Sequence, residues 1–241
     1  MKLDQVMKEL RAAGTAQNRK IYARHGVTSD MFGVSYANLK KLAGKIKTDQ
    51  EIALGLWDTE NHDARVLATM VADPQALNKK ILESWIKGVD CYVLGDALSG
   101  VAAKSPAALP LMKKWMAARK EWVGQVGWNM LCHAANCDDS MEDDEFAAYI
   151  PLIEASIHQA KNRVRYAMNG ALIAIGMRSP ALGQAAIAAA ERIGPVDVDH
   201  GETSCKTPDA ASYIKQASQR RKKAVAGRSA AKKSRKTTAG K

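Results

Sequence analysis

Hydrophobic residues recur at helical spacing through most of residues 1–193, and short polar segments interrupt them. An apolar stripe over residues 52–57 stops at the polar segment 58–61. A second stripe covers residues 65–71 and ends just before Pro74, because the residue that precedes a proline is disfavoured in a helix. This succession predicts two helices joined by a short turn.

The same succession occurs twice more along the chain. The further predicted pairs are residues 109–118 with 123–135 and residues 150–160 with 164–175. The turns at 61–65, 120–123 and 161–165 carry comparable groups, and their separation of about 30–45 residues is typical of HEAT-like helical pairs. We therefore predict an all-α, HEAT-like helical-repeat solenoid over residues 1–193, with a concave face lined by the second helix of each pair. A single irregular helical bundle is the alternative.

Three polar residues begin second helices and are candidates for that concave face. They are Arg65, Gln125 and Arg165. Helix amino ends present unpaired backbone N–H groups that suit phosphate oxygens, so we predict that these residues contact DNA. The competing interpretation is that the arginines pair with nearby acids such as Asp63.

The composition supports a helical, non-secreted protein. Hydrophobic residues make up 46% of the chain and aromatic residues only 5%, which argues against a β-sandwich or barrel. No stretch approaches the ~20 apolar residues of a membrane span, and the first residues lack the pattern of a signal peptide. The four cysteines form no CxxC pair. We expect a cytoplasmic, nucleoid-associated protein without a disulfide framework, membrane contact or cofactor.

The positive charge is concentrated at the carboxyl end. The net charge is +11, and eleven of the 36 basic residues lie in 215–241, where no acid occurs. Residues 1–214 carry 25 basic and 25 acidic residues. We predict a disordered basic tail over residues 218–241 that binds the DNA backbone, although RNA or an acidic partner would also satisfy its charges. Its first basic residues are Arg220, Arg221, Lys222 and Lys223.

Residues 194–217 have a different character from both the helical body and the tail. The stretch 195–201 alternates and ends in a turn at Gly201, and a short helix is predicted from Ala210 to Ala217. We expect an ordered loop and helix that pack on the body. The segment contains Asp197, Asp199, His200, Cys205 and Asp209. This spacing fits no standard zinc motif, so we predict no metal site but a hydrogen-bonded loop, from which His200 or Lys206 faces a substrate.

Several motifs resemble the AlkD-type DNA alkylation repair family, whose members are HEAT-like. The similar stretches within residues 20–180 are Tyr22-Ala23-Arg24-His25-Gly26-Val27, Phe32-Gly33-Val34-Ser35-Tyr36, Leu39-Lys40-Lys41-Leu42-Ala43, Leu56-Trp57, Asp63-Ala64-Arg65-Val66-Leu67-Ala68, Trp85 and Tyr92-Val93-Leu94-Gly95-Asp96. The segments Val198-Asp199-His200-Gly201 and Cys205-Lys206-Thr207-Pro208 resemble an uncharacterised branch of that family.

The resemblance implies a DNA glycosylase that removes N3- and N7-alkylated purines. It places the catalytic acid on Asp96 and an aromatic partner on Tyr92, and their i, i+4 spacing puts both on one helix face. A carboxylate suits this chemistry because the sugar gains positive charge as the bond to the base breaks. The family's second tryptophan falls on Gly170 and its arginine falls near Gln125, so both are replaced here. Trp128 is a candidate substitute for the missing ring.

Two functional hypotheses follow. In the first, the protein is an alkylpurine DNA glycosylase in which Asp96 stabilises the oxocarbenium-like transition state and Tyr92 forms an aromatic wall. In the second, it is a non-catalytic DNA-binding scaffold related to such enzymes. Under both, the expected partner is double-stranded DNA, alkylated in the first case, and the expected state is a monomer. For Trp57, Trp85, Trp115 and Trp122 we predict core packing.

Overall fold

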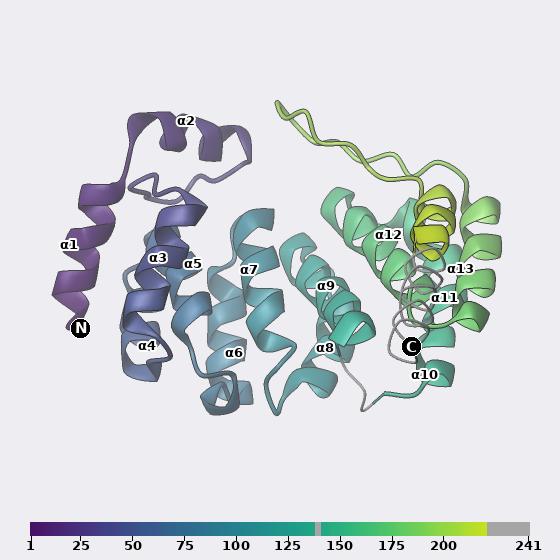
Figure 1. Cartoon of the computed structure of the whole chain (residues 1–241), viewed down its shortest axis with the longest axis horizontal. Coiled ribbons are helices and arrows are strands. Elements are labelled where there is room, and N and C mark those ends of the chain that lie inside the picture. The colour runs from purple at the N-terminus through teal and green to yellow at the C-terminus, as the bar shows by residue number, and fades with distance from the viewer. Residues whose placement is uncertain (138–140, 221–241) are drawn as a thin grey trace, which may run out of the picture.

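The computed structural model describes residues 1–137 and 141–220, and helices account for most of them (Figure 1). Within these ranges there is no β-strand, only an isolated antiparallel bridge between Gly14 and Val34. The all-α prediction is confirmed. The helices are α1 Leu3–Ala13, α2 Ala16–Arg24, α3 Tyr36–Ile46, α4 Gln50–Asp58, α5 His62–Val71, η1 Pro74–Ala76, α6 Lys79–Trp85, η2 Ile86–Gly88, α7 Tyr92–Ala102, α8 Ala108–Met116, α9 Glu121–Cys137, α10 Asp143–Ala147, α11 Tyr149–Ser156, η3 Ile157–Gln159, α12 Asn162–Gly176 and α13 Pro180–Ile193, with a last helix over residues 210–220.

The predicted helical pairs are present as α4 with α5, α8 with α9, and α11 with α12. Polar side chains cap the first of these pairs. The Asp49 carboxylate accepts the Ile52 N–H at 3.0 Å, and the Asn61 side chain accepts the Ala64 N–H at 3.2 Å. Such caps satisfy backbone groups that the helix itself leaves unpaired, which explains why the polar segment 58–61 separates two helices.

The pairs stack in a row, so the chain forms an array and not an irregular bundle. The second helices α5, α7, α9 and α12 contact one another in that order. Figure 1 shows the row bowed, with α2 and the segment before the last helix rising on the same side. None of the helices in the described ranges is long and apolar enough to cross a membrane.

Aromatic side chains fill the space between neighbouring pairs. The Trp57 and Trp85 rings stack with their centroids 4.4 Å apart and an interplanar angle of 4°. Both are buried, and so is Trp115, which confirms the core assignment for these three residues. Trp122 is partly buried and packs against the same core.

The carboxylate of Asp63 fixes the loop between α2 and α3. It is fully buried and accepts the backbone N–H groups of Phe32, Gly33 and Val34 at 2.7, 2.9 and 2.8 Å. The Tyr22 hydroxyl of α2 donates to the Val34 carbonyl. Hydrogen bonds to an ionised group are stronger than neutral ones, so this loop is held firmly on the amino end of α5.

Residues 194–209 form an extended segment, here called the arm, that leaves α13 and returns to the last helix. The helix over residues 210–220 buries Ile214 against the row, where Gly176 leaves space for its side chain. This helix was predicted to end at Ala217, but it continues through Arg220. The disordered tail was predicted to begin at residue 218, which is wrong for residues 218–220 because they belong to this helix, and residues 221–241 lie outside the described residues.

Candidate nucleic-acid interface

Asp96 and Tyr92 lie one turn apart at the start of α7, as their spacing predicts. The Asp96 Oδ1 atom accepts Nε2 of Gln125 at 2.8 Å and Nδ2 of Asn129 at 2.7 Å. Gln125 Nε2 also donates to the Tyr92 carbonyl at 3.2 Å. Two amides on one face of α9 therefore hold the carboxylate in a defined orientation.

The surroundings of Asp96 disfavour its charge. Its side chain is exposed to solvent, although neighbouring protein atoms partly desolvate the carboxylate. This partial desolvation raises the pKa of Asp96 from 3.8 to about 6, against the opposing effects of the Gln125 and Asn129 hydrogen bonds and the Arg163 charge. At neutral pH the group is still mainly a carboxylate, so it can stabilise a nearby positive charge.

Tyr92 is held between two basic residues. Its hydroxyl contacts Nδ1 of His25, the residue that follows α2, and the two rings are tilted with centroids 5.9 Å apart. The guanidinium of Arg163 lies over the Tyr92 ring, 4.0 Å from its centroid. Arg163 lies in the first turn of α12, and its backbone N–H donates to Glu121 of α9 at 2.7 Å.

A second aromatic ring is present near Tyr92, but it is not at position 170, where the family resemblance places a tryptophan. Gly170 faces open space, with nothing within 4 Å of where a Cβ would stand. One turn earlier on α12, the exposed ring of Tyr166 packs edge-on against His200, with centroids 5.5 Å apart. Burial and the Asp96 charge raise the pKa of Tyr166. Trp128 is 6% exposed and lines a different cavity, so it is not the substitute ring.

The arm is fastened to α12 at its base. Arg165 Nη1 donates to the Asp197 carbonyl at 2.8 Å, and the Asn162 amide exchanges two hydrogen bonds with the Asp199 backbone at 2.8 and 2.7 Å. Asn169 donates to the Pro208 carbonyl at 2.9 Å. The base of the arm is therefore a built part of the fold.

The tip of the arm reaches toward α2, as Figure 1 shows. Gly201 has a φ of 59° and stands so that a Cβ added to it would be 3.8 Å from the Arg24 carbonyl oxygen. His200 Nε2 and the Thr207 hydroxyl lie 3.0 Å apart and join the outgoing and returning halves. In the described ranges no three His, Cys, Asp or Glu side chains are grouped to hold a metal ion.

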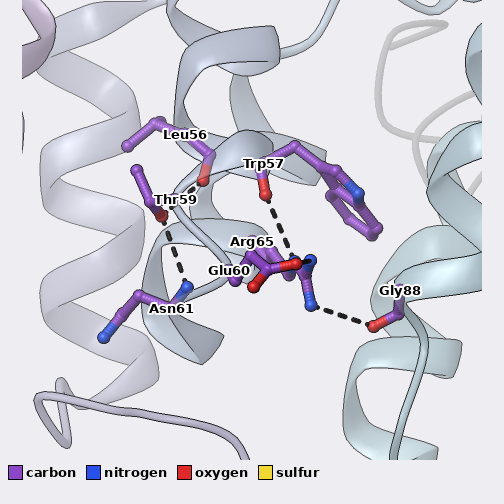
Figure 2. Close-up of polar contacts among 7 residues, drawn as sticks. All are labelled: Leu56, Trp57, Thr59, Glu60, Asn61, Arg65 and Gly88. Atoms are coloured by element: carbon purple, nitrogen blue, oxygen red, sulfur yellow. Dashed lines mark hydrogen bonds and ion pairs between the residues drawn. The ribbon is translucent and has the colours of Figure 1, made fainter.

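Arg65 uses its guanidinium within the fold (Figure 2). Its Nε donates to the Trp57 carbonyl at 3.2 Å and its Nη1 donates to the Gly88 carbonyl at 3.1 Å. A loose ion pair of 3.5 Å joins it to Glu60, and only 11% of its side chain is exposed. Arg65 thus ties one helical pair to the next, and the acid beside it is Glu60, not Asp63.

The other predicted DNA contacts have different surroundings. Gln125 is buried and orients Asp96, while Arg165 holds the arm. Lys206 is exposed on the arm, and Arg220 is exposed at the end of the last helix. The remaining predicted contacts, Arg221, Lys222 and Lys223, lie outside the described residues.

Helix α2 presents a basic surface that was not among the predicted DNA contacts. It buries none of its residues, and the stretch 16–26 contains no acid. Lys20 and Arg24 are exposed and lie one turn apart, so they share a face. Arg19 is also exposed but donates to the Phe32 carbonyl at 3.2 Å. The signal that could have identified this surface is the run of basic residues without an acid.

Comparisons with known proteins identify relatives along nearly the whole chain. Residues 6–233 match the family described as DNA alkylation repair enzyme. The chain is 30% identical to the uncharacterized protein Lin0241 of Listeria innocua, over 90% of this chain and 97% of that protein. It is 29% identical to the uncharacterized protein Lmo0209 of Listeria monocytogenes, over 91% and 98%.

A solved structure gives the same result in three dimensions. It is described as a new family of proteins related to the HEAT-like repeat DNA glycosylases with affinity for branched DNA structures. The TM-score is 0.83 at 29% identity, and the match covers 91% of this chain and 95% of that one. The predicted HEAT-like repeat fold and the predicted family are therefore both confirmed, and this chain belongs to the DNA alkylation repair enzyme family.

Proposed function

We propose that this protein binds DNA, that it prefers branched DNA to a continuous duplex, and that it does so without excising bases. The observation that carries the proposal is the arm, which spans from α12 to the carboxyl end of α2, where His25 contacts Tyr92. A straight duplex that follows the row of helices would meet the arm. A branch point has a gap between its DNA duplexes, and that gap can admit the arm of the protein.

The charges around this face support DNA as the partner. Lys20 and Arg24 stand on α2, Arg163 stands beside Tyr92, and Lys206 stands on the arm. Backbone phosphates supply most of the affinity in sequence-independent DNA binding, and exposed cations on one face suit them. The relative of known structure, whose family is described as having affinity for branched DNA, supports the same choice of partner. Arg65 is not part of the proposed surface because its donors are used inside the fold.

Competition binding tests this proposal. A labelled three-way junction is titrated with the protein at ~0.15 M ionic strength, with unlabelled junction or a duplex of equal length as competitor. We expect the junction to compete at least about tenfold better, which is ~1.4 kcal/mol. The double variant His200→Ala, Lys206→Ala should lose part of that preference, whereas Arg192→Gln, which removes a charge from α13, should keep it. Equal competition by junction and duplex would contradict the proposal.

The second candidate function is excision of N3- or N7-alkylated purines, and the orientation of Asp96 favours it. Its Oδ1 atom is held by two amides, while Oδ2 accepts no hydrogen bond from the described residues. A carboxylate fixed in this way could stabilise the oxocarbenium-like transition state without having to reorganise. The test is release of 7-methylguanine from methylated duplex DNA by the wild type and by Asp96→Asn. Release by the wild type that Asp96→Asn abolishes would establish this candidate in place of the non-catalytic one.

A further inference from the structure

The side chains around Tyr92 form a set that suits a cation. Two aromatic rings, Tyr92 and Tyr166, and one carboxylate, Asp96, come from α7 and α12. The face of an aromatic ring attracts positive charge, and a partly desolvated carboxylate attracts it more strongly. An empty set of this kind would accept the positively charged ring of an N7-alkylated purine.

The chain supplies its own cation at this position. The guanidinium of Arg163 lies 4.0 Å from the Tyr92 ring centroid. Its charge lowers the pKa of Asp96 and of Tyr166. Tyr166 follows Arg163 by three residues on α12, so the two side chains share a face of that helix. The guanidinium makes no hydrogen bond or ion pair with any residue that the structure describes. Contact with the Tyr92 ring therefore holds the guanidinium in place, and the Asp96 charge attracts it.

We propose that Arg163 is a built-in occupant of this cation site and determines its specificity by excluding cationic bases. A cationic purine that approached Tyr92 would have to displace the guanidinium from the ring. It would then share one carboxylate with a second positive charge. A neutral base gains less from the site and is not the ligand for which the carboxylate and the rings are suited. The proposal deepens the proposed function, since it gives a physical reason why this face would bind DNA without removing alkylated bases.

A nucleoside probe tests the proposal independently of DNA binding. Wild type, Arg163→Gln and Arg163→Lys are titrated at pH 6.5 with 7-methylguanosine, whose purine is cationic while N1 keeps its proton, and with guanosine, which is neutral. We expect Arg163→Gln to bind 7-methylguanosine at least about tenfold more tightly than wild type, with guanosine unchanged. Arg163→Lys keeps a cation at the site and should bind as weakly as wild type. The double variant Arg163→Gln, Asp96→Asn should lose the gain.

The outcomes separate this proposal from the proposed function. Equal binding of 7-methylguanosine by wild type and a folded Arg163→Gln would overturn it, and so would an equal gain for guanosine. Arg163→Met keeps the aliphatic stem and provides a second neutral variant, which must behave like Arg163→Gln if that variant fails to fold. The junction competition is run on the same proteins. A wild type that binds no junction, combined with a gain for 7-methylguanosine in Arg163→Gln, would remove the proposed function and leave this proposal standing.

Discussion

Replacement of Asp96 by asparagine is expected to stabilise the folded protein at neutral pH. Asparagine keeps an oxygen that can accept Nε2 of Gln125 and Nδ2 of Asn129, so both anchoring hydrogen bonds remain possible. What it removes is a carboxylate whose charge is disfavoured by partial desolvation, which raises the pKa of Asp96 to about 6. Groups placed for binding or chemistry commonly lower the stability of the fold in this way.

The expected magnitude follows from the pKa. Against the ordinary value of 3.8, a pKa of about 6 corresponds to ~3 kcal/mol if the full effect reached the free energy of unfolding. Solvent touches part of the side chain and screens its charge, so we expect Asp96→Asn to stabilise the protein by ~1–2 kcal/mol at pH 7.5. For a chain of this size that is a rise in Tm of about 2–8 °C.

The pH dependence gives the effect a distinctive sign. A folded-state pKa above the unfolded value means that the folded protein takes up the proton first, so wild type gains stability as pH falls from 7 through 6. The difference between Asp96→Asn and wild type should therefore shrink and vanish near pH 4. Urea unfolding of both proteins at pH 7.5, 6 and 4 measures it. Asp96→Asn that is less stable than wild type at pH 7.5, or a difference independent of pH, would refute the reasoning.

Asp209 provides a control of opposite sign. It caps the last helix by accepting the Ser212 N–H at 2.7 Å, and its hydrogen bonds to Ser212 lower its pKa. A lowered pKa contributes stability that is present above the ordinary value of 3.8 and is lost as pH falls through the folded value. Asp209→Asn should therefore destabilise the protein at pH 7.5 and approach wild type only below pH 4.

Three further predictions concern the fold and the tail. Arg65→Ala should destabilise the protein by ~1–3 kcal/mol in urea unfolding, because it leaves the Gly88 carbonyl unpaired and the Trp57 carbonyl with only backbone donors such as the Glu60 N–H, and should leave the junction affinity of the folded fraction unchanged. Asp63→Asn should cost at least ~2 kcal/mol in the same assay, since one of its oxygens becomes a donor facing backbone N–H groups. Removal of residues 221–241 should weaken duplex binding and flatten its dependence on salt, whereas equal affinity with and without them would contradict a DNA-binding tail.

Local sequence patterns were sufficient for the helical pairs and for part of the candidate site. The polar segment 58–61 marks the turn between α4 and α5 because capping is a local property of the chain. The spacing of Tyr92 and Asp96 places them on one face because that too depends only on helix geometry. The partners of a long side chain, in contrast, depend on how distant segments pack around it. Arg65 lies in the first turn of a second helix, close to the predicted position, but its donors reach carbonyls of α4 and of residue 88.

Residues that approach the site from elsewhere in the chain could not be inferred in the same way. Arg163 and Tyr166 lie on α12, and their nearness to Asp96 depends on how closely α7, α9 and α12 pack. The reach of the arm likewise depends on its anchors, Arg165 and Asn162, and not on its own alternating pattern. Gly170 suggested a missing aromatic ring, whereas the ring that is present lies one turn earlier on the same helix.

The repeat itself contains a signal that would have found more of the site. The fifth residue of each second helix is Val66 in α5, Asp96 in α7, Gln125 in α9 and Tyr166 in α12. Asp96, Gln125 and Tyr166 belong to the candidate site. Most of the site therefore comes from the same position in successive helical pairs. The fourth residue of each is Arg65, Gly95, Gly124 and Arg165.

The fourth residue is an arginine in α5 and α12, at the two ends of this row, and a glycine in α7 and α9, in its middle. Arg65 and Arg165 each donate Nε to a carbonyl near the end of the preceding helix, at 3.2 and 3.1 Å, and a second nitrogen to a segment farther along the chain. They therefore tie pairs together through the backbone. In the middle, a Cβ on Gly95 would stand 3.4 Å from Gln125, and one on Gly124 would stand 3.1 Å from Val164. These glycines let α7, α9 and α12 approach closely, and that approach brings Asp96, its amides and the α12 side chains within reach of one another.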